Sequence, residues 1–110
     1  MTSRIIVNSS TFGARLRQAR ERSGLAQDRL GVLAGLEESS SSARISRYES
    51  GIHEPPFKFA VALAKVLSVP VAFLYCNDDN LAEIVLLYAD ASEPGRHCIL
   101  SSARATRRVP

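Results

Sequence analysis

Residues 11 to 75 carry apolar side chains at helical spacing, in short runs that end at glycine or proline. Phe12, Leu16 and Ala19 follow one another at i, i+4 and i+7, which places them on one face of a helix. Gly24 comes directly after this run, at the position where a helix commonly ends. The later runs end at Gly35, at Gly51 and just before Pro70. This pattern predicts an all-α domain of short helices joined by tight turns.

The length and composition of the chain narrow the class of protein further. The 110 residues suffice for one modest hydrophobic core and not for two. Hydrophobic residues make up 45% and charged residues 23%, as in a folded globular chain. Ile5–Val7 is too short an apolar run for a secretion signal, and no run approaches the roughly 18–20 apolar residues of a membrane span. We therefore expect a cytoplasmic protein without membrane contact.

Residues that commonly carry catalysis or bind metal are sparse. Cys76 and Cys98 form no CxxC pair, so we expect reduced thiols. His53 and His97 lie far apart in the sequence and have no evident catalytic neighbours. No phosphate-binding GxxxxGK[ST] loop, dinucleotide GxGxxG loop or HExxH zinc motif occurs. The sequence predicts no enzymatic activity, no metal site and no cofactor.

The net charge of +3 is small, but it is unevenly distributed. Residues 1–23 hold five arginines and a single acidic residue, a local charge of +4, so the rest of the chain sums to −1. The residues are Arg4, Arg15, Arg17, Arg20 and Arg22, against Glu21. Such a basic end favours a polyanionic partner only weakly by itself, and its position on a helix gives it more weight.

An ordered series of motifs accompanies the helical pattern. The motifs are Phe12-Gly13-x-Arg15-Leu16-Arg17-x-Ala19-Arg20, Gly24-Leu25-x-Gln27-x-x-Leu30-x-x-x-Ala34-Gly35, Ile45-Ser46-Arg47-Tyr48-Glu49-x-Gly51, Pro56, and Leu63-Ala64-Lys65-x-Leu67-x-Val69. In this order and spacing, residues 11–75 resemble the XRE family, the helix-turn-helix domain of Cro and the lambda-type phage repressors. The resemblance implies a lambda-repressor-like domain of five packed helices that binds double-stranded DNA, usually as a homodimer on a two-fold operator.

The resemblance also assigns candidate contacts along the second helix of the motif, at about residues 40–49. The base-reading candidates are Ser41, Ser42, Ala43, Arg44 and Arg47. Serine hydroxyls can bond several base edges, and arginine can bond guanine through two N–H groups. The candidates for contact with the sugar–phosphate backbone are Arg15, Arg17, Arg22, Gln27, Ser39, Ser40, Ser46, His53 and Lys58. The aromatic side chains of Tyr48, Phe57, Phe59 and Phe73 are expected in the core rather than as stacking platforms for bases.

One segment departs from the family pattern. Between Gly35 and Ile45 the chain has nine residues, more than the pattern usually contains. They either lengthen the turn or add a turn to the front of the recognition helix, which would bring Ser39 and Ser40 toward DNA. Glu37 and Glu38 would repel phosphate unless they point away or occupy the helix N-terminus, where negative charge is favourable.

The remaining segments leave alternatives open. Residues 1–10 form an N-terminal arm, and residues 76–92 predict a further helix with Leu81, Ile84, Val85 and Tyr88 on one face. That stripe either closes the core or forms a dimer interface. Residues 93–110 are a weakly patterned basic tail, either disordered or able to reach phosphates.

Two functions follow from these observations. The first is a sequence-specific transcriptional regulator, a repressor that binds a palindromic operator as a homodimer. The alternative is a protein-interaction module built on a helix-turn-helix shell, such as an antitoxin, in which the stripe or the tail holds a partner protein.

Overall fold

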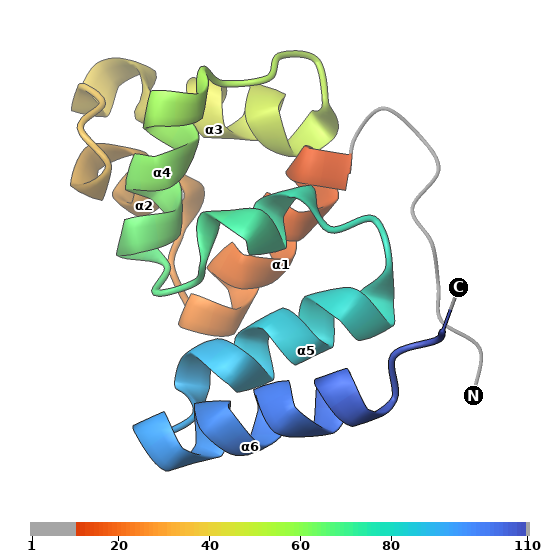
Figure 1. The fold of residues 1–110 in the computed structure, drawn as a ribbon. Coiled ribbons are helices and arrows are strands. Elements are labelled where there is room, and N and C mark those ends of the chain that lie inside the picture. Colours follow the sequence, from red (N-terminus) through yellow and green to blue (C-terminus); the bar gives the residue numbers. More distant parts are fainter. Residues whose placement is uncertain (1–10, 110) are drawn as a thin grey trace.

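The computed structural model describes residues 11–109, and the predicted arm 1–10 lies outside the described part of the chain. All of its elements are helices, so the prediction of an all-α, lambda-repressor-like fold is confirmed (Figure 1). The elements are α1 (Thr11–Ser23), α2 (Gln27–Leu33), α3 (Glu38–Ser50), α4 (Phe57–Val66), the 3-10 helix η1 (Val71–Tyr75), α5 (Asp79–Asp90) and α6 (Glu93–Ala105). None of these helices is long and apolar enough to cross a membrane.

The first five elements surround one hydrophobic core. Each contributes at least one side chain that is almost wholly removed from water: Leu16, Leu30, Ile45, Leu63 and Phe73. Periodicity predicted four of these residues correctly as inward positions, and Phe73 was expected in the core as an aromatic residue. Two apolar residues behave differently, because Phe57 is 62% exposed and Leu33 is 48% exposed. The prediction that Phe57 belongs to the core is therefore wrong, since it begins α4 at the rim of the domain.

Helices α2 and α3 form the most extensive contact between elements, and a glycine allows their close approach. A Cβ atom at Gly31 would lie 1.9 Å from the Oγ of Ser41, so a larger residue there would displace the Ser41 side chain or the helices themselves. The Ser41 hydroxyl donates a hydrogen bond of 2.7 Å to the carbonyl oxygen of Asp28 on α2. This contact fixes α2 across the back of α3.

The additional residues at 36–44 lengthen α3 at its front. Gly35 takes a φ of +112°, a conformation that favours glycine, and α3 begins only three residues later at Glu38. Ser39 and Ser40 therefore lie within the first turn of α3. Of the two alternatives drawn from the sequence, the structure has the longer helix and the short turn.

We call α1 to η1 the core unit, and beyond it the chain forms two helices where one was expected. Helix α5 begins at its cap Asp78, whose carboxylate accepts hydrogen bonds from the backbone N–H groups of Asn80 and Leu81. The segment predicted as a weakly patterned tail instead begins with α6, which is capped by Ser92 and has Pro94 in its first turn. The signals for α6 were present in the sequence, because a serine cap followed by a proline in the first turn is typical of a helix start.

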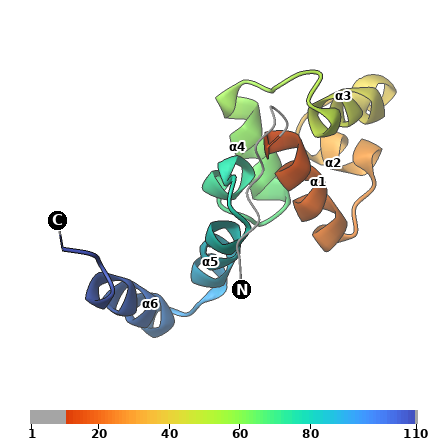
Figure 2. The same cartoon turned by 90° about the vertical axis from the view of Figure 1, so that its right-hand side faces the viewer.

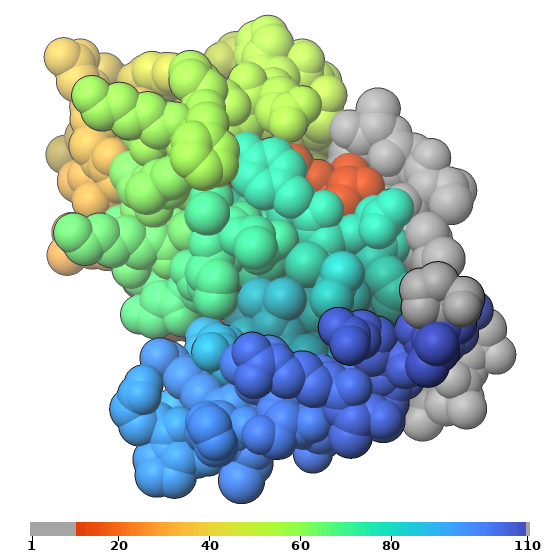
Figure 3. Space-filling model, viewed as in Figure 1, coloured from red at the N-terminus to blue at the C-terminus, as the bar shows by residue number. Residues whose placement is uncertain are grey.

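Helices α5 and α6 lie side by side at the edge of the molecule. Among the described residues, the main contact of α6 is with α5, and none of its side chains is buried. Figure 2 shows α6 extending away from the core unit, and Figure 3 shows it bordering the lower side of the surface. Only the single residue Ala82 of α5 is buried. The C-terminal helices therefore project from the core rather than completing it.

Candidate nucleic-acid interface

Helix α3 divides into a buried side and an exposed side. Ile45 and Tyr48 face the core, whereas Ser42, Ala43 and Arg44 are exposed. Ser46 and Arg47 are exposed in the next turn of the helix. Because α2 crosses the back of α3, this exposed side can approach a groove about 12 Å wide without a clash from the rest of the domain.

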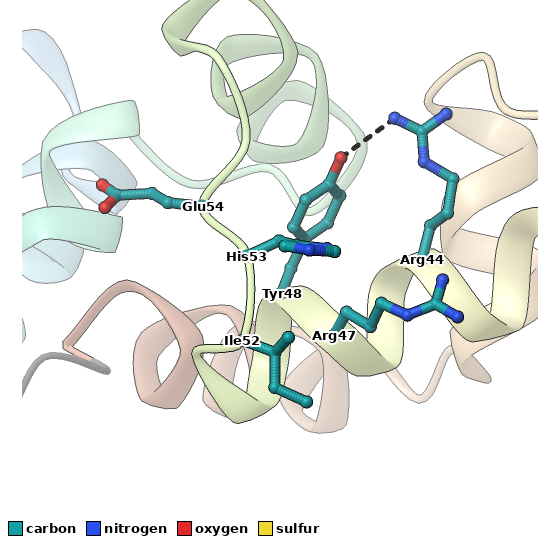
Figure 4. A pocket seen from close by; sticks show the side chains of 6 residues that line it. All are labelled: Arg44, Arg47, Tyr48, Ile52, His53 and Glu54. Atoms are coloured by element: carbon teal, nitrogen blue, oxygen red, sulfur yellow. Dashed lines mark hydrogen bonds between the residues drawn. The ribbon is translucent and has the colours of Figure 1, made fainter.

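Two arginines of α3 border an open hollow of about 570 Å³ at the end of the helix (Figure 4). Its lining residues are Arg44, Arg47, Tyr48, Ile52, His53 and Glu54. In Figure 4 the guanidinium groups of Arg44 and Arg47 project on the same side of α3, and the Glu54 carboxylate points away from them. The hollow is therefore cationic on the side of α3, which suits the phosphates and the acceptor-rich guanine edge of DNA.

The arginines of α1 differ from those of α3 in their partners. Arg15, Arg17, Arg20 and Arg22 of α1 each pair with a carboxylate: Asp79, Glu21, Glu49 and Asp90 respectively. Within the described residues, neither Arg44 nor Arg47 has such a partner. The local excess of +4 that the sequence places at the N-terminal end is thus largely neutralised on α1 by the fold. Among the described residues of the motif, Arg29 on α2 and Arg44 and Arg47 on α3 are the arginines without an ion pair.

Arg15 is not available for DNA, so its prediction as a backbone contact is wrong. Its side chain is 3% exposed, its Nε donates to the carbonyl oxygen of Cys76 at 2.7 Å, and a terminal nitrogen lies 2.9 Å from Asp79 Oδ1. The guanidinium also lies 5.7 Å from the ring centroid of Phe73. Arg15 therefore joins α1 to the start of α5, a partner 64 residues away that the sequence pattern does not reveal.

The prediction that Ser41 reads bases is likewise wrong. Its side chain is fully buried between α2 and α3, and its hydroxyl bonds the Asp28 carbonyl. The run of four serines at 39–42 therefore contains one packing residue among more exposed ones. Ser39 and Ser42 are exposed, and Ser40 is half-buried with its hydroxyl 3.4 Å from the Glu37 carbonyl oxygen.

Gln27 belongs to a polar network behind α3. Its Nε2 donates to Glu49 Oε1 at 3.1 Å, and the same carboxylate accepts two N–H groups of Arg20. The hydrogen bond to Glu49 raises the pKa of Arg20 above its usual range. An amide nitrogen has two hydrogens, so Gln27 can keep this bond and still offer a donor to phosphate. Glu49 is structural, because its carboxylate holds Arg20 and Gln27 behind α3.

The other backbone candidates lie at the surface. Arg17 is exposed and lies 3.4 Å from Glu21 one turn along α1, whereas Arg22 is 3.1 Å from Asp90 of α5 and would have to leave that ion pair to bind DNA. Ser46, His53 and Lys58 are exposed on α3, on the loop after it and on α4. His53 lines the same hollow as Arg44 and Arg47.

Two acidic residues occupy the start of α3. Glu37 is the N-cap residue, although its side chain makes no capping hydrogen bond, and Glu38 lies in the first turn. Negative charge here is favourable for the helix dipole and unfavourable for phosphate. Attraction to DNA at this surface therefore depends on Arg44 and Arg47, which lie six and nine residues after Glu38.

The sequence reasoning missed three residues of the hollow: Tyr48, Ile52 and Glu54. Tyr48 was expected only as a core residue, and its ring is indeed 5% exposed. Its hydroxyl nevertheless accepts a hydrogen bond of 3.1 Å from Arg44. The i, i+4 spacing of Arg44 and Tyr48 was the available signal, because residues four apart are neighbours on a helix.

The predicted dimer residues lie mainly at the surface of α5. Leu81, Ile84 and Tyr88 are 49%, 53% and 41% exposed, whereas Val85 packs partly against the core. Two shallow apolar hollows of about 540 and 410 Å³ flank Ile84, one toward α6 and one toward Pro70. The stripe therefore closes the core only at Val85.

A basic helix braced by a shorter helix across its back is the arrangement of a helix-turn-helix DNA-binding domain. A family model described as a helix-turn-helix domain matches residues 11–73. The chain belongs to this family, and the resemblance to the XRE domains is confirmed. It is a DNA-binding protein of transcription regulation, and its family is generally non-enzymatic.

Among solved structures, the chain is similar to the crystal structure of the transcriptional regulator BswR. The two are 39% identical with a TM-score of 0.81, over 84% of this chain and 92% of the other. This coverage exceeds the core unit of residues 11–75, so the shared architecture includes part of the C-terminal segment. None of the curated proteins matches the chain.

Proposed function

We propose that the chain is a sequence-specific transcriptional repressor that binds a palindromic operator as a homodimer. The observation that carries this proposal is the exposed face of α3, where Arg44 and Arg47 project without a carboxylate partner in the described structure. Ser42, Ala43, Arg44 and Arg47 are the base-reading residues. Gln27, Ser39, Ser46, His53 and Lys58, with Arg17 and Arg22 at the edge, are the backbone contacts.

The distribution of charge supports sequence-specific binding of DNA rather than non-specific binding. Non-specific affinity grows with the number of phosphates that lysine and arginine neutralise. Here the α1 arginines are paired with acids, and α3 begins with Glu37 and Glu38. The recognition helix therefore presents Arg44 and Arg47 beside two acidic residues rather than a dense basic patch, which favours discrimination among sequences over uniform attraction to phosphate.

Selection of bound sites from a random duplex pool tests the proposal, with sedimentation giving the stoichiometry of the complex. We expect a palindrome whose half-sites are about one helical turn apart, bound by two copies of the chain.

Arg47→Ala should reduce discrimination at one base pair of each half-site by roughly 1–3 kcal/mol. Lys65→Ala is the matched control, because it removes an exposed cation at the end of α4 that lies away from α3 (Figure 1). Equal binding of all duplexes would contradict the proposal.

A second candidate function has one observation in its favour. Helices α5 and α6 expose Leu81, Ile84, Leu87, Tyr88 and Leu100, a surface that a partner protein of the antitoxin type would cover. In that case a complex with an unrelated protein replaces the homodimer. Sedimentation of the purified chain separates the two: self-association with loss on Ile84→Glu favours the homodimer, and a monomer at all concentrations favours the partner protein.

A further inference from the structure

Tyr48 links the core to the exposed face of α3. Its ring is buried and packs against Phe59, with the ring centroids 6.0 Å apart and the planes at 49°. Phe59 belongs to α4, so two helices fix the orientation of the tyrosine ring. The hydroxyl emerges at the hollow and accepts the 3.1 Å hydrogen bond from a terminal nitrogen of Arg44 (Figure 4).

The two arginines of the hollow are therefore held differently. Arg44 is tied to a rigid, buried ring, whereas no hydrogen bond to the Arg47 guanidinium is found in the described part of the chain. Both side chains leave α3 on the same side and line the same hollow. The protein thus contains its own comparison between a restrained and an unrestrained arginine.

Restraint of this kind favours specific binding. A free arginine loses much rotamer freedom when it is fixed on a base, and a side chain already fixed in the unbound protein loses less. The bond to Tyr48 uses one of the five N–H donors of the guanidinium. The remaining donors include an adjacent pair, which a bidentate contact with guanine O6 and N7 requires.

We propose that Tyr48 is a positioning residue that orients Arg44 for base reading. The inference rests on the proposed function, and it deepens it by distinguishing two classes of base contact within one recognition helix. Tyr48 does not touch DNA in this arrangement. Its influence is confined to the base pair that Arg44 reads and does not extend to the pair that Arg47 reads.

The test uses the full chain and the operator selected by the wild-type protein. Arg44→Ala and Arg47→Ala first identify the base pair that each arginine reads. Tyr48→Phe removes the hydroxyl and keeps the ring on Phe59, so we expect discrimination at the Arg44 base pair to fall about two- to tenfold, with no change at the Arg47 base pair. In the Arg44→Ala background, Tyr48→Phe should have no further effect. Tyr75→Phe, which removes a hydroxyl from η1, is the matched control.

A second measurement reports orientation without DNA. The side-chain ¹⁵Nε order parameter of Arg44 should fall in Tyr48→Phe, while that of Arg47 stays constant. This comparison is made below the thermal transition of both proteins, so a lower melting temperature of the variant does not obscure it.

Several outcomes would overturn the inference. A uniform loss of affinity at every base pair would mean that Tyr48 acts only through stability. Unchanged discrimination, an unchanged Arg44 order parameter, or an equal effect in the Arg44→Ala background would each exclude a positioning role. If the wild-type chain selects no site, the proposed function fails and the inference falls with it; if the wild type selects a site and only the Tyr48→Phe results disagree, the inference alone fails.

Discussion

The core unit of α1 to η1 and the helical pair of α5 and α6 bury their apolar side chains to very different degrees. In the core unit, residues such as Leu16, Leu30 and Phe73 have almost no contact with water. In the pair, the small side chain of Ala82 is buried, whereas Ile84 and Leu87 remain more than half exposed. The core unit therefore specifies its own structure, and the pair is amphipathic without an internal core.

This difference separates two tasks within one short chain. The core unit places α3 rigidly, because every neighbour of that helix is itself packed. The pair is joined to the unit by the buried side chain of Ala82, by the partly buried Val85 and Leu86, and by two ion pairs, Arg15 with Asp79 and Arg22 with Asp90. In our proposal the core unit reads DNA, and the pair of α5 and α6, whose apolar surface is exposed, mediates assembly.

The largest expected effect concerns the two cysteines, Cys76 at the junction that follows the core unit and Cys98 in the helical pair. Cys76 is buried next to η1, and burial raises the pKa of its thiol, whereas Cys98 is exposed on α6. A thiol reagent attacks the thiolate, so Cys76 should react only when the core unit opens. We expect the labelling rates to differ by a factor on the order of 10³ or more, measured by mass spectrometry over time.

Denaturant supplies the control for this comparison. Both cysteines should react at similar rates in the unfolded chain, because their surroundings are then alike. Comparable rates in the folded protein would mean that the joint between η1 and α5 opens readily, and the distinction between a rigid unit and a projecting pair would be lost.

The next effect compares two leucines. Leu30→Ala removes a fully buried side chain from α2 and should lower the free energy of unfolding by about 2–5 kcal/mol. Leu87→Ala removes a side chain that is 57% exposed on α5, so its effect at low protein concentration should stay within about 0.5 kcal/mol. Urea denaturation followed by circular dichroism measures both.

Protein concentration sharpens the comparison of the leucines. If two chains associate through α5, the effect of Leu87→Ala should grow with concentration, because association stabilises only the folded state. A cost for Leu87→Ala as large as that for Leu30→Ala in dilute protein would show that the pair contributes to the stability of the single chain.

The spacing of apolar residues predicted the core unit well, because the buried face of each of its helices is defined by residues close together in the sequence. The spacing of Phe12, Leu16 and Ala19 is enough to define one buried face. It fails for Phe57, which has the correct period but begins a helix at the rim, where no neighbour covers it. The same limit applies to α6, whose apolar residues remain partly exposed.

The candidate site was predictable in outline and not in its exceptions. Arg44 and Arg47 follow from the motif. Ser41 does not follow the motif, because the added turn of α3 and the absence of a side chain at Gly31 allow that serine to pack against α2. Arg15 departs because its partners, Cys76 and Asp79, lie more than sixty residues away in the sequence. Such contacts depend on the assembled fold, which no local period encodes.

A smaller effect than that of Leu30→Ala is expected at the joint between the two regions. Arg15→Met keeps much of the length of a side chain that is 3% exposed, but it leaves the Cys76 carbonyl and Asp79 without their donor. We expect a loss of about 1–3 kcal/mol in the free energy of unfolding, at the lower end of the range for buried pairs, because Asp79 is itself 41% exposed and still reaches water.

Arg17→Met is the matched control on the same helix. Its ion pair with Glu21 is exposed on both sides, so its removal should change stability by less than about 0.5 kcal/mol. Denaturant melts of both variants measure the difference, and hydrogen exchange locates it: in Arg15→Met the amides of α5 and α6 should lose protection before those of α1 to α4. Equal loss of protection throughout the chain would show that Arg15 supports the core unit itself, and the two regions would then unfold as one.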